Sequence, residues 1–151
     1  MTEASELCQK LQSVWDADFP MVSAMGVRAA HFDNHTLTTH TPLAGNTNIH
    51  GTAFAGSLYA IEALTAWGLL FLELELAGLA GSIIHATGNI EFDRPIGGDI
   101  VVTSNFLAHP DAMAELAARG KIKLTMTSEA YADGEVAGRF SGAFGIRLER
   151  P

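Results

Sequence analysis

The hydrophobic pattern is helical at the start of the chain and strand-like over much of the rest. Apolar side chains recur every three or four residues within 3–16, which predicts a short amphipathic helix. The next apolar segments, 27–32 and 36–41, alternate with polar residues or are rich in β-branched ones, so they predict a hairpin that turns at Asp33-Asn34. A loop of small and polar residues follows at 42–51.

A mostly apolar stretch at 53–72 is long enough in principle to cross a bilayer. Glu62 lies at its centre, where a carboxylate would cost roughly 3 kcal/mol in hydrocarbon. A helix that is apolar nearly all round is also typical of a helix buried on every side. We therefore predict a buried core helix that ends near Ala77, before Gly78 and Gly81, and no membrane span.

Four strand-like segments fill the rest of the chain, with a loop or short helix at 110–118 and a hairpin turn at Asp133-Gly134. This order predicts one α+β domain over residues 1–151, in which a curved antiparallel sheet wraps around one long central helix. A single sheet leaves an edge strand open, so we expect two copies to join edge to edge. The predicted strands are 82–92, 99–107, 121–131 and 136–148.

Composition narrows the classes of function. Charged residues make up only 17% of the chain and the net charge is -8, which argues against binding to nucleic acid or to an anionic membrane. The single cysteine, Cys8, excludes a disulfide framework and a cysteine-based metal site. The acidic N-terminus lacks the pattern of a signal peptide, so we expect a cytoplasmic protein. We predict no metal, because the histidines show no ligand spacing; those considered are His31, His35, His40, His85 and His109.

Several motifs carry a family resemblance. The run NTNIHGTAFAGSLY at 46–59 combines an N-x-N loop with a T-x-F-x-G-S-L-Y helix start, and TAWG at 65–68 supplies a mid-helix A-W-G element. FDRPIGGD at 92–99 ends a strand at an R-P-I turn, and FSG at 140–142 matches a usual last strand. Over essentially its whole length the chain resembles the YiiD C-terminal-type "putative thioesterase" domains of the hotdog superfamily.

The resemblance implies a hotdog fold and chemistry on acyl thioesters. Related stand-alone domains are understood to decarboxylate malonyl-acyl carrier protein, which gives acetyl-acyl carrier protein for the initiation of fatty acid synthesis. In these domains the second asparagine of the N-x-N loop, here Asn48, is the critical side chain, and Asn46 would join it or hold the loop. The implied partners are the malonyl thioester of acyl carrier protein or of coenzyme A, and a second copy of the chain in a homodimer or a dimer of dimers. No cofactor is implied.

The residues themselves allow this chemistry. Decarboxylation and hydrolysis both place negative charge on a thioester oxygen, and the start of the long helix offers unpaired N–H groups near Ala55 and Gly56. Alternatively, Ala-Gly-Ser at 55–57 simply starts the helix against a strand. We expect substrate contacts from the loop and the helix start, at Thr52, Phe54, Ala55, Gly56 and Ser57.

A missing acid separates the two reactions. Many thioesterases of the hotdog superfamily, which this chain resembles, carry an Asp or Glu one to two turns into the helix. The matching position in this sequence is Ala63. Glu62 points about 100° away around the helix, and we expect it to form a hydrogen bond or an ion pair across the dimer. Without a base, hydrolysis loses a factor of roughly a hundred or more, whereas decarboxylation needs none. Decarboxylation is thus the leading hypothesis, followed by acyl-coenzyme A or acyl-carrier protein thioesterase activity and by non-catalytic binding of acyl thioesters.

Basic residues could attract an acidic carrier protein despite the net charge. Arg119, Lys121 and Lys123 alternate, so we expect them on one strand face, while Arg94 lies at a strand end. Such a patch would steer the carrier. The alternative is that these charges protect an edge strand.

Overall fold

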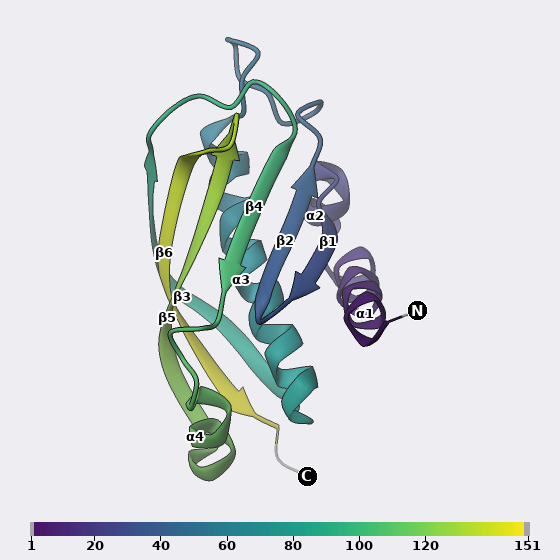
Figure 1. Ribbon diagram of the computed structural model, residues 1–151, viewed down its shortest axis with the longest axis vertical. Helices are drawn as coiled ribbons and strands as arrows, with labels where there is room; N and C mark the ends of the chain where they lie inside the picture. Colours follow the sequence, from purple (N-terminus) through teal and green to yellow (C-terminus); the bar gives the residue numbers. More distant parts are fainter. Residues whose placement is uncertain (1, 150–151) are drawn as a thin grey trace.

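A six-stranded antiparallel sheet curls around helix α3 in the computed structural model of the protein, which describes residues 2–149 (Figure 1). The strand order is β1-β2-β4-β5-β6-β3. This architecture confirms the predicted α+β hotdog fold. The elements are α1 (Glu3–Asp18), α2 (Pro20–Met25), β1 (Arg28–Asp33), β2 (Thr36–Thr41), α3 (Ala55–Ala77), β3 (Gly81–Phe92), β4 (Ile100–Asn105), α4 (Ala112–Arg119), β5 (Lys121–Ala132) and β6 (Glu135–Leu148).

One helix was not predicted, and one turn is displaced from its predicted place. Helix α2 follows α1 directly, with Pro20 in its first turn, where the missing N–H of proline costs nothing. The β1–β2 turn lies at Asn34 and His35, one residue later than predicted. Both have left-handed backbone, with φ of 46° and 57°, as a two-residue type I′ hairpin requires.

Helix α3 is the core of the molecule. By length and composition alone it could cross a membrane, yet half of its apolar window is buried inside the protein. The sheet covers it on one side and α1 packs against another (Figure 1). A Cβ at Gly68 would lie 2.7 Å from the ring of Trp15, so the glycine allows α1 to approach α3 closely.

Glu62 lies in the middle of this buried helix and faces its own sheet. Its side chain is fully buried, and one carboxyl oxygen lies 2.7 Å from the place where a Cβ at Gly138 would stand. Within residues 2–149 neither carboxyl oxygen has a hydrogen-bond partner. The expected ion pair across a dimer is therefore wrong, because the carboxyl points into its own protomer. Burial raises the pKa of Glu62 to about 8; the nearby backbone of Ala130 opposes this rise and the charge of Glu129 adds to it.

The raised pKa of Glu62 predicts an unusual pH dependence of stability. Folding takes up a proton between the ordinary pKa of 4.5 and the folded value of about 8, so the free energy of unfolding should fall as the pH rises through this window. The total loss should be on the order of a few kcal/mol. Glu62→Gln should remove this loss, as measured by urea unfolding at pH 5 and pH 8. Glu6→Gln, on the exposed face of α1, is the control; equal pH slopes for wild type and Glu62→Gln would contradict the assignment.

Strand β3 is an open edge twelve residues long, and in the described part of the chain its one partner strand is β6. Ile84 on it is 62% exposed, although it is a large apolar side chain. Long open edges with apolar side chains are templates for pairing, so we predict self-association through β3. Ile84→Lys should raise the dissociation constant at least tenfold in sedimentation equilibrium, because it replaces an apolar side chain of the joined edge by a charged one. Met21→Lys, at an exposed position of α2, should leave it unchanged; a monomeric wild type at micromolar concentration would contradict the prediction.

Candidate active site at the start of the central helix

A pocket of about 380 Å³ lies where three segments meet: the loop before α3, the first turn of α3 and the segment after β3. The loop is joined to the third segment by the N–H of Ala53, which donates to the carbonyl of Ile96 over 2.8 Å. The lining residues are Asn48, Thr52, Ala53, Ala55, Leu58, Phe92, Asp93, Arg94, Pro95 and Ile96. Four of the predicted site residues are therefore brought together: Asn48, Thr52, Ala55 and Arg94.

Asn48 organises the loop at the pocket wall. Its Oδ1 accepts hydrogen bonds from the backbone N–H of His50 (2.9 Å) and of Thr52 (3.2 Å), which forms a tight turn. One proton of its Nδ2 goes to Thr52 Oγ1 at 2.9 Å. The other meets only the carbonyl of Ala53 at 3.4 Å, near the outer limit for a hydrogen bond. Asn48 thus has one weakly engaged donor beside the pocket.

Asn46 has a different role from its neighbour. It is buried, and its Nδ2 donates to the carbonyls of Met25 (2.9 Å) and Pro42 (3.0 Å). The backbone carbonyl of Asn46 accepts from the N–H of Phe54 at 2.7 Å. Both side-chain donors are used inside the protein, so Asn46 holds the loop against the helix start and does not reach the pocket.

The start of α3 presents free backbone donors. Among residues 2–149 no side chain caps the helix, and the first intrahelical bond runs from Leu58 N–H to the carbonyl of Phe54 at 3.0 Å. The N–H groups of Ala55, Gly56 and Ser57 come before that bond, so no intrahelical carbonyl is available to them. They lie at the positive end of a 23-residue helix. This arrangement is suited to an anion.

Phe54 was expected to line the pocket, but it does not. It is 53% exposed, and its ring packs over the helix start, so that a Cβ at Gly56 would lie only 2.5 Å from it. The absence of a side chain at Gly56 therefore makes room for this ring. Ser57 is half-buried and also lies outside the pocket lining. The apolar part of the wall comes instead from Leu58, Phe92 and Ile96.

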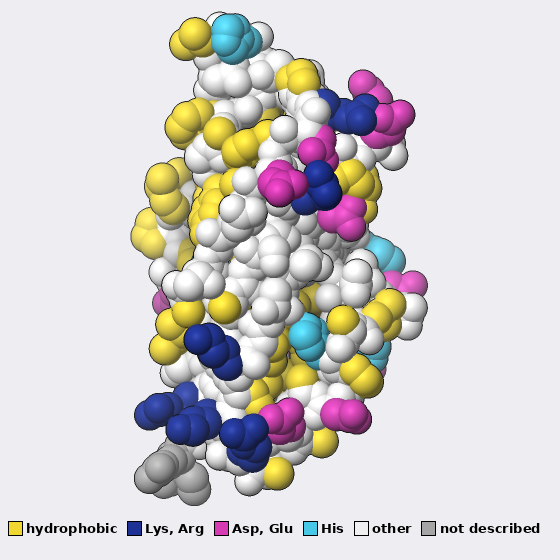
Figure 2. Space-filling view, turned by 90° about the vertical axis from the view of Figure 1, so that its left-hand side faces the viewer, with side chains coloured by type: hydrophobic (Ala, Val, Ile, Leu, Met, Phe, Trp, Pro, Cys, Tyr) yellow, Lys and Arg dark blue, Asp and Glu magenta, His cyan; other side chains and the backbone are white. Residues whose placement is uncertain are grey.

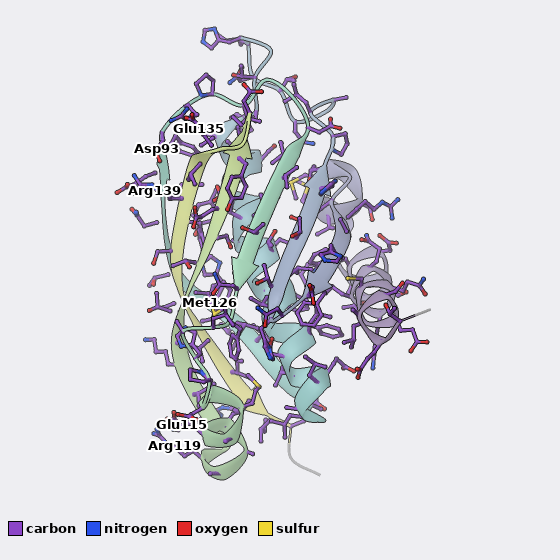
Figure 3. The ribbon with its side chains drawn as sticks, viewed as in Figure 1. Asp93, Glu115, Arg119, Met126, Glu135 and Arg139 are labelled. Atoms are coloured by element: carbon purple, nitrogen blue, oxygen red, sulfur yellow. The ribbon has the colours of Figure 1, made fainter. Side chains whose placement is uncertain are left out.

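The charged residues at the pocket form two ion pairs. Arg94 is paired with Glu135, and Arg139 binds Asp93 through two hydrogen bonds of 2.8 and 3.1 Å (Figure 3). The hydrogen bond from Arg139 lowers the pKa of the Asp93 carboxyl. Asp93 is the one acid among the residues that line the pocket, and a carboxylate whose pKa is lowered is a poor general base.

The predicted basic patch is divided. Arg119 does not lie on a strand; it ends α4 and pairs with Glu115, because the short helix extends one residue further than predicted. Lys121 and Lys123 do share the exposed face of β5. Figure 2 shows Lys and Arg side chains gathered at this lower end of the molecule. Arg94 lies at the opposite end, because it pairs with Glu135, which is labelled at the upper end in Figure 3.

An aromatic cluster under the open edge was not predicted. The ring of His85 on β3 stacks on Phe144 with centroids 4.6 Å apart and lies 6.1 Å from Tyr59 of α3. A Cβ at Gly88 would lie 2.1 Å from the Tyr59 hydroxyl. The alternation of side chains along β3 turns His85 toward the inner face of the sheet, and the pairing of β3 with β6 brings it next to Phe144. Its position could not be found without the register.

Fold and site together define a hotdog protein with an anion-binding helix start beside an apolar pocket. The chain matches the family described as "Putative thioesterase (yiiD_Cterm)" over residues 8–147 and belongs to it.

Solved structures agree with this assignment. The "putative thioesterase" of Shewanella oneidensis is 29% identical, with a TM-score of 0.88 over 96% of this chain and 99% of that one. A protein of unknown function from Chlorobaculum tepidum TLS has a TM-score of 0.90 at 23% identity, over 97% of each chain. A "probable thioesterase" of Pseudomonas aeruginosa has a TM-score of 0.77 at 24% identity, over 93% and 95%. The last two show likeness of fold alone.

Proposed function

We propose that this protein decarboxylates a malonyl thioester of acyl carrier protein to give the acetyl thioester that primes fatty acid synthesis. One observation carries the proposal: free N–H groups at the start of α3 adjoin a pocket whose one lining acid, Asp93, is held by Arg139. Such a site stabilises a developing anion and lacks a good base. Decarboxylation needs stabilisation of the anion and does not need a base.

The reaction begins when the thioester oxygen accepts hydrogen bonds from the helix start. The bond between the α-carbon and the carboxylate breaks, CO2 leaves, and the electron pair stays behind as an enolate whose charge lies on the thioester oxygen. A proton from water then reaches the α-carbon and gives the acetyl thioester. The N–H groups of Ala55 and Gly56 are the donors for that oxygen, and they are already oriented before the charge develops.

Asn48 and Arg94 complete the site in this proposal. The weakly engaged proton of Asn48 Nδ2 turns from the carbonyl of Ala53 to the enolate oxygen. Arg94, at the mouth beside Glu135, attracts the anionic substrate into the pocket. Leu58 and Phe92 give the leaving carboxylate an apolar wall, which suits neutral CO2 better than a carboxylate.

The acidic carrier is recognised by a dimer in this proposal. Strand β3 begins at Gly81, beside Arg147 of β6 and near Lys121 of β5, and it ends just before the pocket. Antiparallel pairing of two β3 edges would bring the basic lower end of one protomer beside the pocket end of its partner. The patch of Lys121, Lys123, Arg147 and Arg119 would then lie where a carrier protein delivers its substrate.

Thioesterase activity is the second candidate, supported by the description of the family and by that of the Shewanella relative. It would need a base to activate water at the helix start. A third candidate is binding without catalysis. Incubation of the protein with malonyl and acetyl thioesters of acyl carrier protein separates the three. CO2 with an intact acetyl thioester supports our proposal, free thiol from both substrates supports hydrolysis, and unchanged substrates support binding alone.

Two substitutions of Asn48 test its role in decarboxylation. Asn48→Ala should lower kcat by about a hundredfold or more, because one donor to the enolate is lost. Asn48→Asp keeps the acceptor that holds His50 and Thr52, but it removes the donor and adds a negative charge. The fall in kcat for Asn48→Asp should equal or exceed that for Asn48→Ala.

Glu62→Gln is the matched control, because it replaces a buried carboxyl group by an amide of similar shape. Since decarboxylation needs no base, we expect kcat to fall less than fivefold. Thermal unfolding and mass in solution should show that all variants are folded. Near-normal decarboxylation by a folded Asn48→Asp protein would show that only the loop geometry matters. Abolition by Glu62→Gln would move the assignment to an acid-dependent hydrolase.

A further inference from the structure

A second pocket, of about 370 Å³, lies at the opposite end of α3. It is formed by the end of α3, the β1–β2 turn and the segment between β4 and α4. Its walls are apolar apart from two imidazoles and one carboxyl. The residues that matter here are His35, Glu73, Leu76, Phe106, Leu107 and Met113. Glu73 is 18 positions beyond Ala55, which is about 27 Å along the helix, so this pocket is separate from the candidate active site.

A histidine–carboxylate pair forms one wall of this pocket. Nδ1 of His35 lies 2.6 Å from Oε1 of Glu73, and the glutamate is 4% exposed. Burial raises the pKa of Glu73, while the hydrogen bond and the charge of His35 oppose this rise. With the carboxyl ionised, Nδ1–H donates to it, and Nε2 of the neutral ring is left free to accept a proton. The side chain of His35 is half exposed, so water can reach it.

The backbone holds the histidine in place for this contact. His35 has left-handed backbone, with φ of 57°, at the second position of the hairpin turn. Its carbonyl accepts a hydrogen bond from the N–H of Phe106 at 2.9 Å. A second imidazole in the wall, that of His109, is engaged through Nε2 with the carbonyl of Thr125 at 2.8 Å. His35 is therefore the imidazole that combines a buried carboxylate on one nitrogen with an open second nitrogen.

We propose that this pocket is a second, hydrolytic site, in which His35 is the general base and Glu73 its positioning residue. The substrate class is an ester or thioester with an apolar acyl chain, which the walls of Leu76, Phe106 and Leu107 accommodate. His35 lines this pocket together with these apolar side chains. Leu76 and Leu107 are 42% and 56% exposed, so apolar surface here is open to a ligand.

The step balances without any further reactant. Nε2 of His35 takes a proton from water as its oxygen bonds to the acyl carbon, and the carbonyl electron pair moves to the oxygen. When that pair returns, the bond to the leaving alcohol or thiol breaks, and the imidazolium gives its proton to the leaving group. Glu73 keeps the ring oriented and stabilises its positive form. The products are the carboxylic acid and the alcohol or thiol.

The test is hydrolysis of p-nitrophenyl hexanoate by the full chain. His35→Ala should lower kcat/KM by at least a hundredfold, the usual contribution of a general base. Glu73→Gln should lower kcat about tenfold with little change in KM, because the ring loses its ionic partner but keeps its pocket. The acetate ester should react about tenfold or more slowly than the hexanoate. His31→Ala, at an exposed position of neighbouring β1, is the control and should retain full activity.

Two comparisons separate this proposal from the decarboxylase proposal. Asn48→Ala should leave hexanoate hydrolysis unchanged, and His35→Ala should leave decarboxylation unchanged. Absent hydrolysis in the wild type, or an unchanged rate in a folded His35→Ala protein, would overturn the second site and leave the first intact. Loss of hexanoate hydrolysis in Asn48→Ala would overturn the second site and favour a thioesterase at the start of α3.

Discussion

Burial of α3 by a single curved sheet is the constraint on which the rest of this structure depends. Thirteen of its 23 residues are buried, and its apolar side chains point in every direction. A helix of this kind cannot lie on a surface, so the chain must wrap around it. The fully exposed residues of the helix lie at its two ends, at Ala55 and Gly56 and at Leu76 and Ala77. Both pockets described above lie at these ends, one at the first turn and one near Glu73.

The same burial determines which charges the interior can hold. Glu62 faces Gly138 without a hydrogen-bond partner in the described part of the chain, and its raised pKa keeps it protonated near neutral pH. Glu73 is almost as deeply buried but keeps His35 as a partner. The helix thus carries one neutral acid in its middle and two paired acids near its end, Glu73 with His35 and Glu75 with Lys10. Asp93, outside the helix, stays ionised because Arg139 binds it.

Much of the fold could be predicted from the sequence. The long apolar run, its glycine stop at 78 and the alternating strands depend on local pattern, which is why α3 and the strands appear where expected. The site was partly predictable as well, since Asn48, Thr52 and Ala55 are close in sequence. The pairing of Asp93 with Arg139 depends on β3 and β6 being neighbours, which no local pattern reveals. The contact of His35 with Glu73 spans 38 residues and needs the hairpin to fold back on α3.

In the proposed reaction, free N–H groups at the start of α3 bind the thioester oxygen. Amide NMR can follow this contact in the complex of the protein with the amide analogue of malonyl-pantetheine, which keeps the carbonyl oxygen and resists decarboxylation. We expect downfield shifts of the amide protons of Ala55, Gly56 and Ser57 on saturation, with little change around Glu73. Unchanged amides at these three residues in the saturated complex, or shifts concentrated around Glu73, would contradict it.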